Sequence, residues 1–219
     1  MKTINHLSKN HSLIDNYIRQ LRDINTQGSS ELFRENIRRI GRVLAYEISK
    51  TLDYSYQMIS TPLASHQQAQ VSDELVVITI LRAGLPLHDG ILSAIPEAEN
   101  GFISAYRKHD NNGGFEIEVG YVACPSLEGK VLILNDPMLA TGSSFENAIN
   151  ALSKYGKPKR VHLAAVIASQ EGVDYLDQLL DDSFSLWVAA IDPALNEEKF
   201  IVPGLGDAGD LSFGIKLQA

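Results

Sequence analysis

The sequence predicts an α/β fold built on a doubly wound, mainly parallel sheet. The first observation is a set of four apolar runs of strand length, at residues 75–81, 131–134, 161–168 and 184–191. Continuous apolar runs are typical of strands that helices bury on both faces. The second observation is that segments with helical character lie between these runs. Strands that alternate with helices form parallel βαβ units, so the pattern predicts one sheet covered on both sides.

The composition is that of an ordinary globular protein. The chain of 219 residues is long enough to bury a full core, and we expect a single domain over residues 1–219. Its net charge of −8 argues against non-specific nucleic-acid binding, yet it does not exclude small anionic substrates. The chain has no uninterrupted apolar run of membrane-spanning length, no apolar signal segment at its start and a single cysteine. These features predict a cytoplasmic protein that does not bind membranes.

The first 60 residues are expected to form helices that pack on the α/β core. One apolar stripe consists of Leu13, Tyr17, Leu21 and Ile24. A second stripe, after Ser29 or Ser30 as helix cap, consists of Leu32, Phe33, Ile37, Ile40, Val43, Leu44 and Ile48. Four arginines crowd the polar side of this second helix, namely Arg34, Arg38, Arg39 and Arg42. We interpret them as a solvated face, with a contact to a partner subunit as the alternative.

Arg82 directly follows the buried strand at 75–81 and precedes a helical segment at 89–95. Ligands of open α/β sheets bind at the carboxyl edge of the parallel strands, where this arginine is placed. A guanidinium can donate two parallel hydrogen bonds to a phosphate group. Arg82 is therefore a candidate anion ligand, and the alternative is a salt bridge at a strand end.

A β-hairpin is predicted between residues 101 and 121. The strand at 101–106 is followed by a turn at 111–114, after which Phe115, Ile117, Val119 and Tyr121 alternate with polar residues and glycine. A glycine-rich, charged hairpin of this kind is a candidate for a mobile flap over an active site.

Residues 131–152 predict a strand, a hydroxyl-rich loop and a helix. Asn135 and Asp136 stop the apolar strand, and Pro137 is expected to end its ladder. Ser143 and Glu146 fit a capping box, which predicts the start of a helix. The apolar face of that helix consists of Phe145, Ala148, Ile149 and Leu152.

The loop in this segment has the chemistry of a phosphate cradle. Free N–H groups and the positive dipole end of the helix face it, and Thr141, Ser143 and Ser144 add hydroxyl donors. Gly142 allows the backbone to approach an anion. A carboxylate would repel phosphate, so Asp136 is expected to hold ribose hydroxyls or a cation. The alternative is a capped helix start without a ligand.

Residues 200–214 contain four glycines, one proline and two aspartates. This composition argues against an ordinary strand or helix. Such a loop exposes main-chain N–H and C=O groups, which suit the recognition of a flat polar ring. The alternative is a glycine-rich turn near the C-terminus.

Three motifs together resemble the uracil phosphoribosyltransferase family. They are LRAGLPLHDG (81–90), DPMLATGSS (136–144) and IVPGLGDAGD (201–210), and the last matches the uracil-specific signature without a change. Tyr106-Arg107 also resembles the Tyr-Arg pair that precedes the flap in this family. Pro86 and Ser143 stand where the family usually has glycine. If the Ser143 site required a positive φ, serine would be strained there, and we expect that it does not.

The resemblance implies the type I phosphoribosyltransferase fold and a transfer reaction. Uracil and phosphoribosyl pyrophosphate (PRPP) would give UMP and diphosphate in pyrimidine salvage, with Mg²⁺ carried as Mg–PRPP and no metal bound directly by the protein. The PRPP-binding residues implied are Arg82, Arg107, Asp136, Pro137, Met138, Leu139, Ala140, Thr141, Gly142, Ser143, Ser144 and Asp207. The uracil-binding residues implied are Ile201, Gly206, Asp207 and Ala208, within a base-recognition loop at 200–214. The catalytic residues implied are Asp136, Asp207 and Arg107, of which the two aspartates act as organisers rather than as proton acceptors.

The resemblance also implies a homodimer or a higher homo-oligomer, with GTP as a possible effector and no nucleic-acid partner. Two alternatives stay open. One is a phosphoribosyltransferase for another base, and the other is a non-catalytic, nucleotide-binding regulator with the same fold.

Overall fold

The computed structural model describes residues 3–109 and 115–217, and for residues 105–109 and 115–119 it describes the backbone alone. The main sheet has the strand order β1-β10-β9-β7-β4-β5-β6, and β8 pairs with β9. All pairs in it are parallel except β5 with β6. The predicted fold class is therefore confirmed. Among the described residues, no helix has both the length and the apolar character needed to cross a bilayer.

The four apolar runs form neighbouring strands in the centre of the sheet. The strands are β4 (Leu75–Leu81), β7 (Val131–Asn135), β9 (Arg160–Ser169) and β10 (Phe184–Asp192). The flanking strands are β1 (Thr3–His6), β5 (Glu99–His109), β6 (Phe115–Ala123) and β8 (Met138–Leu139). Every residue of β7 is buried, as a strand covered on both faces requires.

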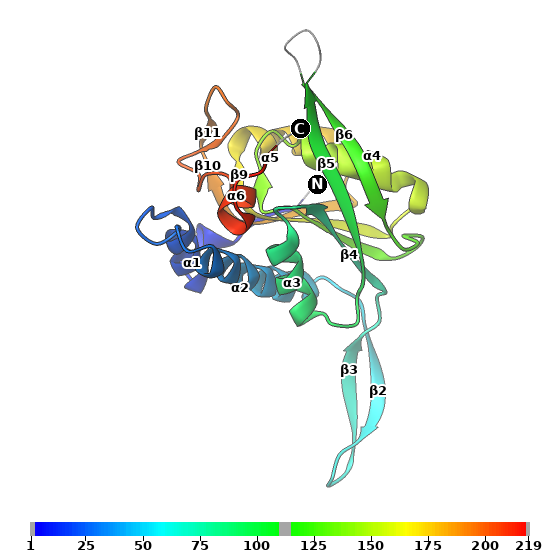
Figure 1. Ribbon diagram of the computed structural model, residues 1–219. Helices are drawn as coiled ribbons and strands as arrows, with labels where there is room; N and C mark the ends of the chain where they lie inside the picture. The colour runs from blue at the N-terminus through cyan, green and yellow to red at the C-terminus, as the bar shows by residue number, and fades with distance from the viewer. Residues whose placement is uncertain (1–2, 110–114, 218–219) are drawn as a thin grey trace.

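Helices cover both faces of this sheet (Figure 1). The helices α1 (Leu13–Arg22), α2 (Ser30–Ser49) and α3 (Leu85–Ala94) share one core with Val77 and Ile133. The helices α4 (Ser143–Leu152) and α5 (Gln170–Leu179) share a second core with Ile78 and Leu134. Because successive side chains of a strand point to opposite faces, each central strand contributes to both cores.

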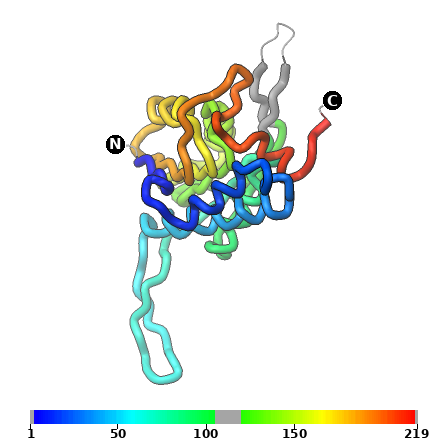
Figure 2. Tube along the Cα trace, turned by 90° about the vertical axis from the view of Figure 1, so that its left-hand side faces the viewer, coloured from blue at the N-terminus to red at the C-terminus, as the bar shows by residue number. Residues whose placement is uncertain are grey.

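The predicted helical region at 1–60 is only partly correct. Residues 3–6 form β1 at the sheet edge, and residues 54–60 form β2 (Tyr54–Ser60). Strand β2 pairs with β3 (Ser65–Val71) in a separate two-stranded hairpin that projects far from the body in both views (Figures 1 and 2). The alternation of Tyr54, Tyr56 and Met58 with polar residues is a strand pattern, although none of the residues of β2 is buried.

The apolar stripe predicted for α1 is also only partly correct, because Leu21 is buried and Tyr17 packs against the core. The helix buries Ile14, Ile18 and Leu21, whereas Leu13 is 66% exposed and Ile24 is 82% exposed. Ser12 caps the helix before Leu13, and the helix ends at Arg22, so Ile24 lies outside it. The stripe predicted for α2 is confirmed at its centre, where Phe33, Ile37, Ile40, Leu44 and Ile48 are buried.

The predicted solvated face of α2 needs a correction, because its arginines contact neighbouring groups. Arg34 donates to the carbonyl of Ser212 at 2.6 Å. Arg38 lies 3.5 Å from Asp89, and Arg42 donates to Ser93 at 3.0 Å, both on α3. These arginines therefore tie α2 to α3 and to the C-terminal segment.

Candidate active site

The predicted site residues lie in loops at the carboxyl edge of the parallel sheet, where α/β proteins bind ligands. Arg82 follows β4, and Asp136 follows its neighbour β7. Thr79 donates to Asn135 Oδ1 at 2.8 Å, and Asn135 Nδ2 donates to the carbonyl of Ile78 at 2.9 Å. These buried hydrogen bonds hold the ends of the two strands together, so the loops that follow them start from one fixed place.

The loop after β4 requires glycine at position 84. A Cβ at Gly84 would lie 2.0 Å from the Thr79 hydroxyl oxygen and 2.6 Å from the carbonyl oxygen of Ile80. The backbone therefore turns directly against the strand end, and α3 begins at once with Leu85.

The phosphate loop, residues 136–144, is anchored by main-chain hydrogen bonds to β9. The carbonyl of Pro137 accepts from the N–H groups of Val166 and Ile167 at 3.0 Å. The ladder of β7 ends at Asn135, as expected, and a separate two-residue pairing with β9 follows at β8. The carbonyl of Ala140 accepts from the Ser169 hydroxyl at 2.6 Å. Hydrogen bonds to β9 therefore hold the loop at Pro137 and at Ala140, before α4 begins.

Helix α4 begins after a left-handed residue rather than after a capping box. Gly142 is the N-cap, with φ of 89°, and Ser143 is the first helical residue. The Thr141 and Ser143 hydroxyls lie 2.9 Å apart, and Glu146 instead accepts from the Tyr175 hydroxyl. The capping-box prediction is therefore wrong, because the glycine turn supplies the helix start. Lys199 is the one non-glycine residue with positive φ in the described part of the chain, so the expectation for Ser143 is confirmed.

The two predicted organisers, Asp136 and Asp207, influence each other electrostatically. Burial, together with the charge of Asp207, raises the pKa of the Asp136 carboxyl to about 7, against hydrogen bonding from the Met138 N–H, which lowers it. Asp136 is half-buried, so part of the residue remains accessible. The ionised carboxylate can accept hydrogen bonds from hydroxyl groups of a ligand.

Arg82 connects the first motif with the last. Its Nη2 donates to Asp210 Oδ1 at 2.9 Å and to the carbonyl of Gly214 at 3.0 Å, and its guanidinium lies 6.0 Å from the centre of the Phe213 ring. Two segments that lie 128 positions apart therefore meet at one side chain.

The base-recognition loop, residues 200–214, contains more regular structure than expected. It includes β12 (Ile201–Val202), which pairs with β11 (Ala194–Leu195), and α6 (Ala208–Phe213). The expectation of a loop without strand or helix is therefore wrong, because Asp207 caps α6 by accepting from the Asp210 N–H at 2.9 Å.

Part of this loop packs into the protein. Ile201, Leu205 and Ala208 are buried in the same core as α2, whereas Phe200, Val202 and Phe213 are exposed. Gly206 takes a φ of 87° and is exposed, so its main chain is accessible.

Two residues near this loop were not singled out from the sequence. Asp210 contacts Arg82, and Lys216 Nζ lies 3.5 Å from Asp207 Oδ2. The spacing of three residues between Asp207 and Asp210 on one helical turn was the available signal for the first. No signal in the sequence pointed to Lys216.

The antiparallel hairpin of β5 and β6 is confirmed, and it rises beyond the sheet in Figure 1. The Arg107 backbone pairs with Ile117, but its side chain lies outside the described residues. The turn predicted at 111–114 also lies outside them. The roles of this arginine and of the flap therefore stay predictions.

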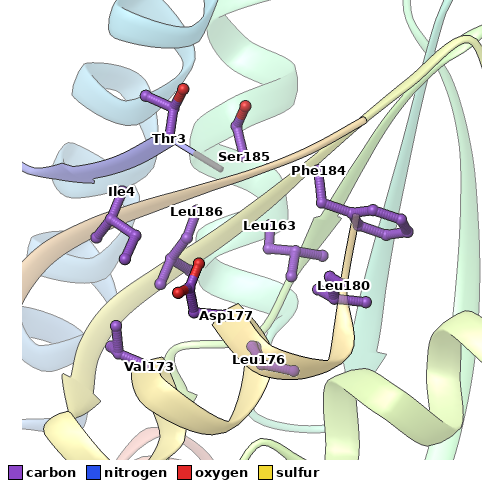
Figure 3. A pocket seen from close by; sticks show the side chains of 10 residues that line it. All are labelled: Thr3, Ile4, Leu163, Val173, Leu176, Asp177, Leu180, Phe184, Ser185 and Leu186. Atoms are coloured by element: carbon purple, nitrogen blue, oxygen red, sulfur yellow. The ribbon is translucent and has the colours of Figure 1, made fainter. Parts of the chain in front are cut away.

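A small pocket elsewhere in the fold shares no residue with the predicted site (Figure 3). It lies between α5 and the strands β1, β9 and β10, and its walls are mainly apolar, with Leu163, Leu176 and Leu186 among them. Asp177 is the one charged residue in its lining. The pocket is a packing gap rather than a place for a charged substrate.

Comparison with known proteins identifies the family. The family model described as uracil phosphoribosyltransferase matches residues 8–215. A uracil phosphoribosyltransferase of Porphyromonas gingivalis is 48% identical over 212 residues, which cover 97% of this chain and 98% of the relative. One of Thermococcus gammatolerans is 38% identical and covers 91% of this chain and 88% of its own. The solved AQ2163 protein of Aquifex aeolicus superposes with a TM-score of 0.88 at 30% identity, covering 99% of this chain and all of its own. The chain belongs to the uracil phosphoribosyltransferase family, a family of phosphoribosyl-transferring enzymes.

Proposed function

We propose that this enzyme joins uracil to the ribose of PRPP and releases diphosphate, forming UMP for pyrimidine salvage. The observation that carries the proposal is the meeting of the phosphate loop, Arg82 and the base-recognition loop at one edge of the sheet. In the reaction, N1 of uracil bonds to the anomeric carbon, the bond from that carbon to diphosphate breaks, and the N1 proton leaves. The transition state has the character of a sugar cation, so positioning and charge stabilisation are the main requirements.

The PRPP half of the site would use the loop after β7. The first turn of α4 and the hydroxyls of Thr141, Ser143 and Ser144 would bind the 5′-phosphate. Asp136 would accept hydrogen bonds from the ribose hydroxyls. The remaining loop residues would contribute backbone groups and shape, namely Pro137, Met138, Leu139, Ala140 and Gly142.

The leaving diphosphate would be bound by Arg82 and Arg107. Arg82 pairs with Asp210, so binding of diphosphate would shift that guanidinium from a carboxylate to a phosphate. An Arg–phosphate contact of this type stabilises the charge that develops as the leaving group departs.

The base would be recognised by main-chain groups of Ile201, Gly206 and Ala208. Uracil presents alternating carbonyl and N–H groups, which backbone N–H and C=O groups complement. Asp207 would lie near the ribose and diphosphate, beside Asp136.

Magnesium would enter as Mg–PRPP, and it would neutralise charge on the departing diphosphate. The described residues contain no cluster of three acidic, histidine or cysteine side chains able to hold a metal ion. PRPP oxygens and water would supply most of the coordination, since Mg²⁺ keeps several waters and needs few protein ligands.

The exposed hairpin of β2 and β3 supports a homodimer or a higher homo-oligomer. Tyr56 and Met58 are each 69% exposed, and an isolated two-stranded hairpin is marginally stable in water. Lys159 nevertheless anchors its base through ion pairs of 2.6 Å to Asp53 and Asp73. A second copy that covers the apolar tip would explain this architecture. Light scattering of the intact chain and of a variant with the hairpin shortened to a tight turn tests it, and a monomer in both cases would contradict it.

GTP activation and a cytoplasmic location are further parts of the proposal. GTP is tested by adding it to the assay below, and an unchanged rate would remove it. A cytoplasmic location fits the substrate, because the charged PRPP does not cross membranes. Fractionation of cells that produce the tagged protein tests the location.

The test of the proposed function is conversion of labelled uracil to UMP with PRPP and magnesium. We expect product with the wild type, and loss of product in Asp136→Asn and Asp207→Ala. Asp177→Asn, an exposed acid on α5, is the matched control and should retain activity. Product with cytosine, hypoxanthine or orotate instead of uracil would assign another base. No product with any base, together with a salt-dependent RNA shift, would favour the regulator.

A further inference from the structure

The base-recognition loop turns sharply at Gly204 and needs external support there. Gly204 has φ of 62° and Gly206 has φ of 87°, and the loop pairs with other strands only through the two residues of β12. A loop of this shape has many main-chain conformations available to it. Contacts from residues outside the loop must therefore stabilise the conformation that faces the ligand.

A buried ion pair binds both main-chain polar groups of Gly204. Arg22 Nη1 donates to Asp192 Oδ2 at 2.7 Å and to the carbonyl of Gly204 at 2.9 Å. Asp192 Oδ2 also accepts from the Gly204 N–H at 2.9 Å, and Arg22 Nη2 donates to Asp192 Oδ1. The Asp192 side chain is 6% exposed and that of Arg22 is 22% exposed. The pair and the turn therefore form one closed hydrogen-bonded unit.

The positions of the two residues make this unit rigid. Asp192 is the last residue of β10, and Arg22 is the last residue of α1. Gln27, which follows α1, adds a hydrogen bond of 3.3 Å from its side-chain amide to the carbonyl of Leu205. The loop is thus fastened at two successive residues to elements that already pack in the core.

We propose that Arg22 and Asp192 are positioning residues for uracil: they hold the Gly204 turn so that the backbone groups after it meet the base. The proposal rests on the proposed function, and it adds an N-terminal arginine that lies outside the family motifs described above. The guanidinium makes two parallel hydrogen bonds to the Asp192 carboxylate while its Nη1 also reaches the Gly204 carbonyl. A lysine ammonium lacks this planar fork and would lose the parallel pair.

Loss of the ion pair should affect the binding of uracil and of PRPP differently. The pair contacts the base-recognition loop and no residue of the phosphate loop. Its loss should therefore raise the KM for uracil and leave the affinity for PRPP nearly unchanged. If the pair only stabilised the fold, its loss would weaken the binding of both substrates, because the whole protein would be affected.

The experiment compares Arg22→Lys and Arg22→Met with Arg19→Met. Arg19 lies on the same helix and has an exposed ion pair of 3.7 Å with Asp23, so its variant removes a similar side chain without touching the loop. We expect the KM for uracil to rise about 10-fold in both Arg22 variants, because a displaced loop would lose hydrogen bonding to the base. PRPP affinity, measured by calorimetry, and the melting temperature of Arg22→Lys should stay close to those of wild type and Arg19→Met.

A parallel measurement follows amide hydrogen exchange of residues 201–208 without ligand, which does not depend on the identity of the base. We expect exchange in this segment to be roughly 10-fold faster in Arg22→Met, with β9 unchanged. Unchanged exchange and unchanged KM for uracil would overturn the proposal, as would parallel losses for both substrates. Wild-type protein that made no UMP while this exchange result held would refute the proposed function and leave the anchoring of the loop established.

Discussion

The buried carboxyl of Asp136 should make PRPP binding sensitive to pH near neutrality. Burial raises its pKa to about 7, and the charge of Asp207 acts in the same direction. The ionised carboxylate is the form that accepts hydrogen bonds from two ribose hydroxyls, whereas the acid keeps a proton that competes for the same oxygens. We therefore expect PRPP to bind preferentially to the enzyme in which Asp136 is ionised.

The magnitude follows from the pKa. At about pH 6, one unit below that value, roughly a tenth of the enzyme carries the ionised carboxylate, so the apparent Kd for PRPP should be about tenfold above its alkaline plateau. This factor corresponds to about 1.4 kcal/mol of binding free energy. At about pH 8 most of the carboxyl is ionised, and the Kd should become independent of pH.

The assay measures PRPP affinity by calorimetry across this range in wild type and in Asp136→Asn, since the variant is expected to form no product. The variant binds PRPP more weakly, but it lacks the titrating carboxyl. PRPP carries a 5′-phosphate that itself titrates near about pH 6, and the variant's profile supplies the baseline for that effect. Parallel profiles in the two proteins would refute the reasoning, because the carboxyl would then be ionised throughout.

Three further predictions concern the phosphate loop and the core. Gly142→Ala should lower the free energy of unfolding by about 1–2 kcal/mol in urea titrations and weaken PRPP binding, because φ is 89° and the new Cβ would lie 2.7 Å from the Tyr175 ring. Ser143→Gly should leave the KM for PRPP unchanged or raise it by up to about tenfold through the lost hydroxyl, and a marked improvement would contradict our account. Burial lowers the pKa of His162 to about 4, below the 6.5 of an unfolded chain, so the unfolded state takes up the proton first. Stability should be complete above about pH 6.5 and fall by up to about 3 kcal/mol towards pH 4 in urea titrations, and His162→Phe should remove this decline.

The buried strands could be predicted from the sequence almost to the residue. The run predicted at 75–81 is β4 itself, and the run at 131–134 extends by one residue in β7. These strands are covered on both faces, so every residue in them is apolar or internally hydrogen-bonded, and the signal is local. The two loops that follow these strands were placed correctly for the same reason.

The exposed hairpin of β2 and β3 could not be predicted in this way. None of the residues of β2 is buried, so its apolar side chains belong to no core. A short alternation of this kind is therefore interpreted as part of the preceding helical segment. Helix α1 shows the related difficulty, because the rows through Leu13 and through Ile14 are both apolar. Only packing against α2 and the sheet decides that the row through Ile14 is buried.

The motifs locate the groups that we expect to contact substrate, but they do not locate the groups that hold those motifs in place. Arg22 and Arg34 occupy helices without a recognised motif, and each donates to a backbone carbonyl of the base-recognition loop, at Gly204 and at Ser212. These contacts join positions 182 and 178 residues apart, and such pairing depends on how the N-terminal helices dock. A chain can therefore carry the complete uracil signature and still recognise the base poorly if α1 or α2 loses its arginine. Charged residues at helix ends beside a signature loop are for this reason the first positions to examine when a member of the family departs from its expected affinity.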